Sequence, residues 1–215
     1  MIKFLFLKFC RLYQESEYEK FKRASPPEIQ RSDVSLPILQ LKALGIDNIV
    51  RFNFPSAPPA KNMVAAVELL FALGALDSGG NLTRPLGEQM AELPLHPTFA
   101  KMLLVSSEFQ CSEEITTIIA MLQIESVFLQ PYGQGAQKAR MAKRKFEVAE
   151  GDLITLLNVY KAFISNNRNK NFCNQNYLSY KRLKRASEMK LQMMKTLKRF
   201  QIPIVSSNGK SNHIY

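Results

Sequence analysis

The sequence has few of the residues that build metal centres and disulfide frameworks. Its 215 residues include three cysteines, two histidines and no tryptophan. Cys10, Cys111 and Cys173 lie far apart and form no Cys-x-x-Cys pair. These spacings fit neither a zinc ribbon nor the disulfide framework of a small secreted protein. We therefore expect reduced thiols inside a cell and no metal site.

Long apolar runs are missing as well. No stretch approaches the roughly 20 apolar residues that a membrane-spanning helix needs. Residues 1–7 imitate the start of a signal peptide, but Lys8 and Arg11 interrupt the apolar run and no small-residue cleavage site follows. The sequence therefore predicts neither a membrane span nor secretion.

The motifs of nucleotide and hydrolytic chemistry are also absent. The Gly-x-x-x-x-Gly-Lys-Ser/Thr loop that cradles nucleotide phosphates does not occur. No aspartate, serine or cysteine flanks His96 in a pattern typical of nucleophilic catalysis. Paired glutamates such as Glu113 and Glu114 fit a charged helix end better than a carboxylate dyad. We expect no catalytic residue and no bound cofactor in this chain.

Apolar residues and positive charge are abundant. Apolar residues make up 46% of the chain, which is enough for the core of one domain or of two small ones. The net charge is +11. Because each Lys or Arg set against a phosphate releases condensed counterions, this charge points to a polyanionic partner.

The apolar pattern of the first half predicts short helices and a hairpin. The clearest helix carries Met63, Val67 and Leu70 at intervals of four and three, and Gly74 stops it. The expected elements are a helix over 36–44, an extended piece over 49–54, a helix over 59–74, a two-strand turn over 76–83 and a helix over 85–92. This order is the outline of a winged-helix domain, which we place at residues 26–96.

In the second half helical periods dominate, because proline and glycine become rare. The expected helices cover 99–109, 112–122, 138–146, 152–164 and 178–200, with a glycine-containing loop over 130–137. The predicted fold class is therefore mainly α. It consists of the winged-helix domain, an all-helical bundle over residues 97–201 and a flexible tail over 202–215.

The last predicted helix concentrates the positive charge. Between Arg168 and Arg199 there are ten Lys or Arg against the single Glu188, which gives +9 of the net +11. At about 100° per residue the apolar and basic side chains fall on opposite faces. The apolar face has Leu183, Ala186, Met189, Met193, Met194, Leu197 and Phe200, and the basic face has Lys181, Lys184, Arg185, Lys195, Lys198 and Arg199. A solvated surface, RNA phosphates and an acidic protein are the alternatives for the basic face.

Other polar positions leave two readings open. Thr155 and Asn158 are three residues apart, so their polar tips share one side of a predicted helix, as a buried pair or as an RNA contact. Tyr180 is a candidate for stacking on a base, although aromatic residues beside a bundle helix more often belong to the core. A second basic cluster consists of Lys138, Arg140, Lys143, Arg144 and Lys145. Glu147 and Glu150 follow it, so local ion pairs and RNA contact are both possible.

A succession of short phrases runs through these elements. They are Pro26-Pro27-Glu28-Ile29-Gln30-Arg31-Ser32, Leu41-Lys42-Ala43-Leu44-Gly45-Ile46-Asp47, Met90-Ala91-Glu92-Leu93-Pro94-Leu95, Gly151-Asp152 and Thr155-Leu156-Leu157-Asn158-Val159-Tyr160. In this order they resemble the region that follows the two ATPase lobes in DEAH-box RNA helicases. The resemblance covers about residues 9–200 and leans towards the spliceosome-associated members.

The resemblance implies a winged-helix domain followed by a helical ratchet domain. It implies ATP and Mg²⁺ for the complete helicase only, since neither the Asp-Glu-Ala-His box nor the arginine-finger motif occurs here. Residues 9–13 resemble the last strand of the second lobe, so residues 1–25 are expected to be a remnant of that lobe and a linker. Residues 1–7 have the look of a truncated product or an incomplete gene model. Leu153 and Phe172 depart from the family pattern, which has His and Trp there.

In the family these domains hold single-stranded RNA without reading its sequence. The resemblance and the charge pattern together give an RNA-binding set of Thr155, Asn158, Tyr180, Lys181, Arg182, Lys184 and Arg185. The alternative is a docking module for a glycine-patch activator protein, with Met63, Val67 and Leu70 at the docking surface. A winged-helix DNA binder ranks third, because the positive charge lies in the bundle. Spliceosomal protein partners and a nuclear location follow from the resemblance alone.

Overall fold

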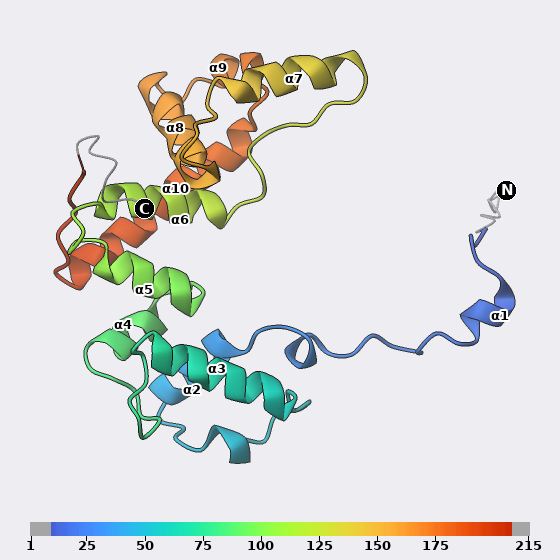
Figure 1. Ribbon diagram of the computed structural model, residues 1–215, viewed down its shortest axis with the longest axis vertical. Helices are drawn as coiled ribbons and strands as arrows, with labels where there is room; N and C mark the ends of the chain where they lie inside the picture. The colour runs from blue at the N-terminus through green and yellow to red at the C-terminus, as the bar shows by residue number, and fades with distance from the viewer. Residues whose placement is uncertain (1–9, 208–215) are drawn as a thin grey trace, which may run out of the picture.

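The computed structural model describes residues 10–207, which are mainly helical (Figure 1). Residues 1–7, with their signal-like pattern, lie outside this range. Strand pairing between residues 10 and 207 consists of the isolated antiparallel bridges Leu76–Leu82 and Phe128–Leu178. In the same range no helix combines the length and the apolar character needed to cross a bilayer. The predicted mainly α fold class is confirmed.

The first half contains the helices of the predicted winged-helix outline. Within residues 26–96 they are the 3₁₀ helix η1 (Glu28–Gln30), α2 (Ser35–Ala43), the 3₁₀ helix η2 (Ile49–Arg51), α3 (Ala60–Ala72) and α4 (Leu86–Glu92). Helix α1 (Glu15–Tyr18) precedes them, in the stretch expected to be a lobe remnant and linker. Gly74, with a φ of +75°, turns the chain after α3 into the Leu76–Leu82 bridge. Gly87 lets α4 approach this turn, since a Cβ there would lie 2.3 Å from the Ala75 carbonyl oxygen.

The extended piece expected over 49–54 is wrong at its start. Residues Ile49–Arg51 form η2, and the Asn48 side chain accepts a hydrogen bond from the Arg51 N–H at 3.1 Å. Ile49 is buried in the core. The side-chain cap and this single buried anchor favour a tight turn over a strand.

The second half is the expected helical bundle. Its helices are α5 (Pro97–Val105), α6 (Ser112–Leu122), α7 (Gln134–Arg144), α8 (Asp152–Ser165), α9 (Lys170–Gln175) and α10 (Tyr180–Arg199). Helix α9 was not expected and has six residues, with Asn169 capping its start through a 2.7 Å bond from the Asn171 N–H. Helix α6 packs against both α8 and α10.

Two apolar cores share the helices α6 and α10. The first core joins α2, α3, α4 and α5 to Ile119 of α6 and to Met193 and Leu197 of α10. The second core joins Met121 at the end of α6 to α8, and to Leu183 and Ala186 at the start of α10. The winged helix and the bundle are therefore joined through α6 and the 20-residue helix α10.

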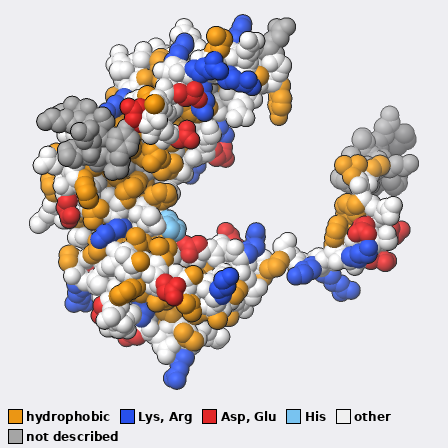
Figure 2. All heavy atoms as spheres, in the orientation of Figure 1, with side chains coloured by type: hydrophobic (Ala, Val, Ile, Leu, Met, Phe, Trp, Pro, Cys, Tyr) orange, Lys and Arg blue, Asp and Glu red, His pale blue; other side chains and the backbone are white. Residues whose placement is uncertain are grey.

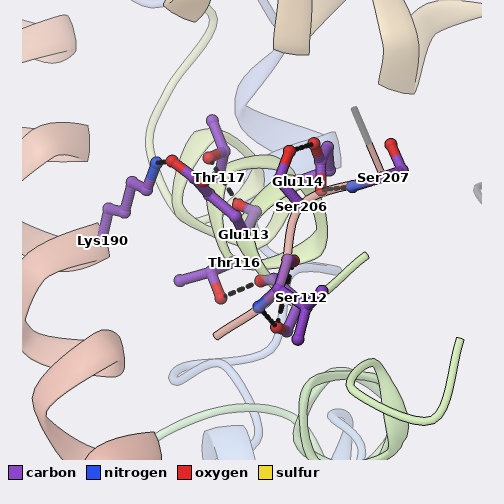
Figure 3. Close-up of polar contacts among 9 residues, drawn as sticks. Ser112, Glu113, Glu114, Thr116, Thr117, Lys190, Ser206 and Ser207 are labelled. Atoms are coloured by element: carbon purple, nitrogen blue, oxygen red, sulfur yellow. Dashed lines mark hydrogen bonds and ion pairs between the residues drawn. The ribbon is translucent and has the colours of Figure 1, made fainter. Parts of the chain in front are cut away.

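The flexible tail expected from residue 202 is wrong as far as residue 207. Ile202 packs against the first core, and the next residues dock on the start of α6 (Figure 3). The Ser112 hydroxyl donates to the Pro203 carbonyl at 3.0 Å and accepts the Val205 N–H at 2.7 Å. The buried Glu114 carboxylate accepts from the Ser206 hydroxyl at 2.6 Å. These bonds satisfy polar groups at the helix start that would otherwise be buried without partners; residues 208–215 lie outside the described range.

Candidate nucleic-acid interface

Helix α10 presents the basic face that its sequence predicts. Ser179 begins the helix by accepting the Arg182 N–H at 3.4 Å. All six residues of the predicted basic face are exposed, and all seven of the apolar face are buried or half-buried. The division into two faces is confirmed. Arg199 at the far end also pairs with Glu92 of α4, so part of its charge is used inside the molecule.

Arg182 has a different position from its basic neighbours. It is half-buried, its guanidinium donates to the Ser126 carbonyl at 2.6 Å, and it pairs with Glu125. These contacts fasten α10 to the segment that follows α6. Arg182 is thus a positioning residue for this surface, with less charge available to a ligand than Lys181 or Arg185.

Two hollows adjoin at the start of α10. One of about 470 Å³ is lined by Lys181, Arg182 and Arg185, and one of about 570 Å³ by Phe128, Tyr132, Arg140 and Lys143. Leu129 lines both, so the two hollows are neighbours on the surface. Figure 2 shows Lys and Arg side chains gathered over the α7 end of the bundle. Cations beside apolar and aromatic groups are the combination that binds single-stranded nucleic acid.

Tyr132 is a residue that the sequence reasoning missed. Its side chain is 100% exposed at the mouth of the second hollow. Lys143 lies 5.3 Å from the centre of the Phe128 ring and 3.2 Å from Glu147, so local pairing occurs within the second basic cluster. An aromatic residue in a glycine-containing loop before a basic helix was the available signal.

The structure separates the other predicted RNA contacts. Thr155 is buried, and its hydroxyl donates to the Gly151 carbonyl at 3.0 Å, closing the first turn of α8. This internal role corrects the expectation that its polar tip is available to RNA. Asn158 is half-buried. The Tyr180 ring contacts the Phe163 ring edge-on, with centroids 6.1 Å apart. Phe163 lies eight residues after Thr155 in α8, which is about 12 Å along the helix axis.

The predicted docking residues form the inner stripe of α3. Leu70 is fully buried, and Met63 and Val67 are half-buried against the first core. Leu70 therefore offers no surface, because this stripe attaches α3 to its own domain. The outer face instead carries Val64 and Phe71, which are 56% and 54% exposed and lie two turns apart.

The fold unites an aspartate, a serine and a histidine that the sequence separates. The Asp33 carboxylate accepts from His96 Nε2 at 2.7 Å and from the Ser35 hydroxyl at 2.5 Å. Burial alone raises the pKa of Asp33, but the hydrogen bonds from Ser35 and His96 outweigh it and lower that pKa below its ordinary value. Ser35 is fully buried and directs its proton to the carboxylate. The cluster therefore links α2 to the start of α5 and does not form a nucleophile with its base.

The described residues show no grouped set of metal ligands. Between residues 10 and 207 no three His, Cys, Asp or Glu side chains are grouped to hold a metal ion. Helix α8 begins after a glycine, Gly151, but its first residue is Asp152, whose carboxylate repels a phosphate.

Comparison with known families matches both halves of the fold. The winged-helix part of the helicase-associated domain (HA2) matches residues 66–95, and its ratchet-like part matches residues 96–156.

Curated relatives share this region in chains that are much longer. The chain is 52% identical over 202 residues to the probable ATP-dependent RNA helicase DHX35 of Pongo abelii, covering 94% of this chain and 28% of that protein. It is 49% identical to the DHX35 homolog of Caenorhabditis elegans (95% and 28%), and 41% identical to the pre-mRNA-splicing factor ATP-dependent RNA helicase prp22 of Schizosaccharomyces pombe (94% and 17%). It spans less than a third of these relatives. These matches show that the chain carries the helicase-associated winged-helix and ratchet-like domains of DEAH-box RNA helicases.

Proposed function

We propose that this chain holds single-stranded RNA, without reading its sequence, as an accessory part of an ATP-dependent RNA helicase. The observation that carries the proposal is the exposed basic face of α10 beside an aromatic-lined hollow. The name of the prp22 relative supports a pre-mRNA splicing context, with spliceosomal proteins as partners and the nucleus as location.

The geometry favours backbone contact over base reading. Helix α10 has 20 residues and is about 30 Å long, so its basic face spans several phosphates of an extended strand. Lysine ammonium groups neutralise phosphates and carry little sequence information. Tyr132 offers a ring on which any base can stack.

The test replaces three exposed basic side chains of α10 that have no ion-pair partner among residues 10–207. We expect the variant Lys181→Gln, Lys184→Gln, Arg185→Gln to bind a fluorescent oligouridylate about tenfold more weakly, at about 0.5 kcal/mol per surface contact. The measurement is fluorescence anisotropy at fixed salt. Arg182 is left intact, because its loss would disturb the contact between α10 and Glu125.

A matched control carries the same charge change on the winged helix. Arg31, Arg51 and Lys61 are exposed and far from α10 in sequence. Their replacement by glutamine should leave the affinity within about twofold. An equal loss in both variants would mean that net charge alone attracts RNA and that α10 is not the contact.

The second candidate, docking of a glycine-patch activator, is supported by the exposed outer face of α3. Apolar contacts are insensitive to salt, so a glycine-patch peptide should bind with little salt dependence. Val64→Asp with Phe71→Asp should abolish that binding. Leu44→Asp changes an apolar residue that is 77% exposed at the end of α2 and serves as control. No peptide binding to the unmodified chain would remove this candidate.

A further inference from the structure

The segment between α1 and the winged helix has no buried residue, although Phe21 near its start contacts the rings of Tyr13 and Tyr18. Every residue from 19 to 28 is exposed, and Figure 1 shows this stretch running as an open strand of chain from α1 to the body of the molecule. Its middle reads Lys22-Arg23-Ala24-Ser25-Pro26-Pro27. Ser25-Pro26 is the only place in the whole sequence where a serine or threonine precedes a proline.

The two prolines prepare Ser25 for an enzyme that binds an extended peptide. Proline fixes its own φ, removes a backbone donor and pushes the preceding residue into the extended region. Lys20 pairs with Glu17 at 2.5 Å, while Lys22 and Arg23 have no ion-pair partner among residues 10–207. The serine is therefore presented on an exposed, basic stretch that belongs to no helix.

A second copy of the same tetrapeptide supplies an internal comparison. Lys184-Arg185-Ala186-Ser187 repeats the residues before and at Ser25, but it lies inside α10. Ser187 is buried, and its hydroxyl donates to the Leu183 carbonyl at 3.1 Å. Glu188 follows it in place of a proline, so the two copies differ in exposure and in the next residue.

We propose that Ser25 is a phosphorylation site for a proline-directed serine kinase. The Ser25 hydroxyl oxygen attacks the γ-phosphorus of ATP held by the kinase. The new O–P bond forms as the bond to the oxygen that bridges to the β-phosphate breaks, ADP leaves, and the hydroxyl proton passes to the kinase's catalytic carboxylate. The product carries a charge of about −1.5 to −2. Lys22 and Arg23 pair with it through charge-assisted hydrogen bonds.

The test uses the full 215-residue chain, purified without modification from bacteria. Incubation with a purified mitogen-activated protein kinase and ATP should add one phosphoryl group, located on Ser25 by peptide mapping and counted by intact mass. Ser25→Ala should abolish it. Pro26→Ala should abolish it with Ser25 still present. Phosphorylation of the Pro26→Ala chain at the same rate as the chain without this substitution would overturn the proposal.

Two peptides separate access from recognition. The peptide of residues 19–28 should be modified by this kinase, and the peptide of residues 181–190 should not. Modification of the 19–28 peptide but not of the full chain would show that Ser25 is inaccessible, which also overturns the proposal. Pairing with Arg23 predicts slower tryptic cleavage after Arg23 in the phosphorylated chain, and equal cleavage rates would overturn that pairing.

Discussion

At the scale of single residues, the two faces of α3 should contribute differently to stability. Leu70 is fully buried, whereas Val64 is more than half exposed on the other side of the helix. We predict that Leu70→Ala lowers the free energy of unfolding by about 2–5 kcal/mol, because it removes apolar contacts and leaves a cavity. Val64→Ala should change it by about 0.5 kcal/mol or less. Urea unfolding measures both, and similar losses would contradict the orientation of α3.

Asp33 gives the molecule a pH dependence that one substitution removes. Since its pKa is lower in the folded chain, the ionised carboxylate stabilises the fold above the unfolded pKa of about 3.9. This contribution is lost as the pH falls through the folded pKa. The stability advantage of the unmodified chain over Asp33→Asn should therefore shrink between about pH 5 and pH 3.

The control for this titration is Asp47→Asn. Asp47 is exposed, and its carboxylate has no ion pair among residues 10–207. Its replacement should leave the difference in unfolding free energy from the unmodified chain nearly constant over the same pH range. A constant difference for Asp33→Asn as well would show that the bonds from Ser35 and His96 do not favour its ionised form.

At the scale of elements, the start of α6 holds the segment that follows α10. The Ser112 hydroxyl is both donor and acceptor for this segment. We predict that Ser112→Ala leaves the Val205 N–H without that acceptor, costs about 1–3 kcal/mol and speeds hydrogen exchange at Val205. Ser165→Ala is the control, because that exposed hydroxyl bonds only the Ala162 carbonyl of its own helix. Unchanged hydrogen exchange at Val205 would contradict the hydrogen bond between the Val205 N–H and the Ser112 hydroxyl.

Elements with long periodic patterns could be predicted from the sequence, and elements fixed by distant partners could not. Helix α10 declares both its faces within its own 20 residues. Helix α9 has only six residues, too few for a period to show. The ordered conformation of residues 202–207 depends on their contact with Ser112, which lies 91 residues before Pro203. No local pattern contains that contact.

At the scale of the whole molecule, α6 and α10 make the two cores depend on one another. Leu183 belongs to the second core and Leu197 to the first, and both are fully buried. We predict a single calorimetric unfolding transition, and Leu183→Ala or Leu197→Ala should lower its midpoint without splitting it. Two separate transitions would show that the winged helix and the bundle fold independently.

The candidate interface was predictable to the same extent as the helices that carry it. The basic face of α10 follows from periodicity and charge alone. The link from Arg182 to Glu125 spans 57 residues, and the cluster of Asp33 and His96 spans 63. These long-range contacts determine which Lys and Arg side chains are available to bind RNA. Burial of Thr155 and Leu70 likewise depends on packing that no single segment encodes.

The most direct test of the central claim is the salt dependence of RNA binding by the unmodified chain. The affinity for oligouridylate and for a mixed-sequence strand should fall in parallel as salt rises. In a plot of log affinity against log salt concentration, each phosphate contact contributes a negative slope of about 0.7. The six Lys and Arg side chains of the α10 basic face therefore allow a slope as steep as about −4. Binding that ignores salt, or that strongly prefers one sequence, would contradict the account.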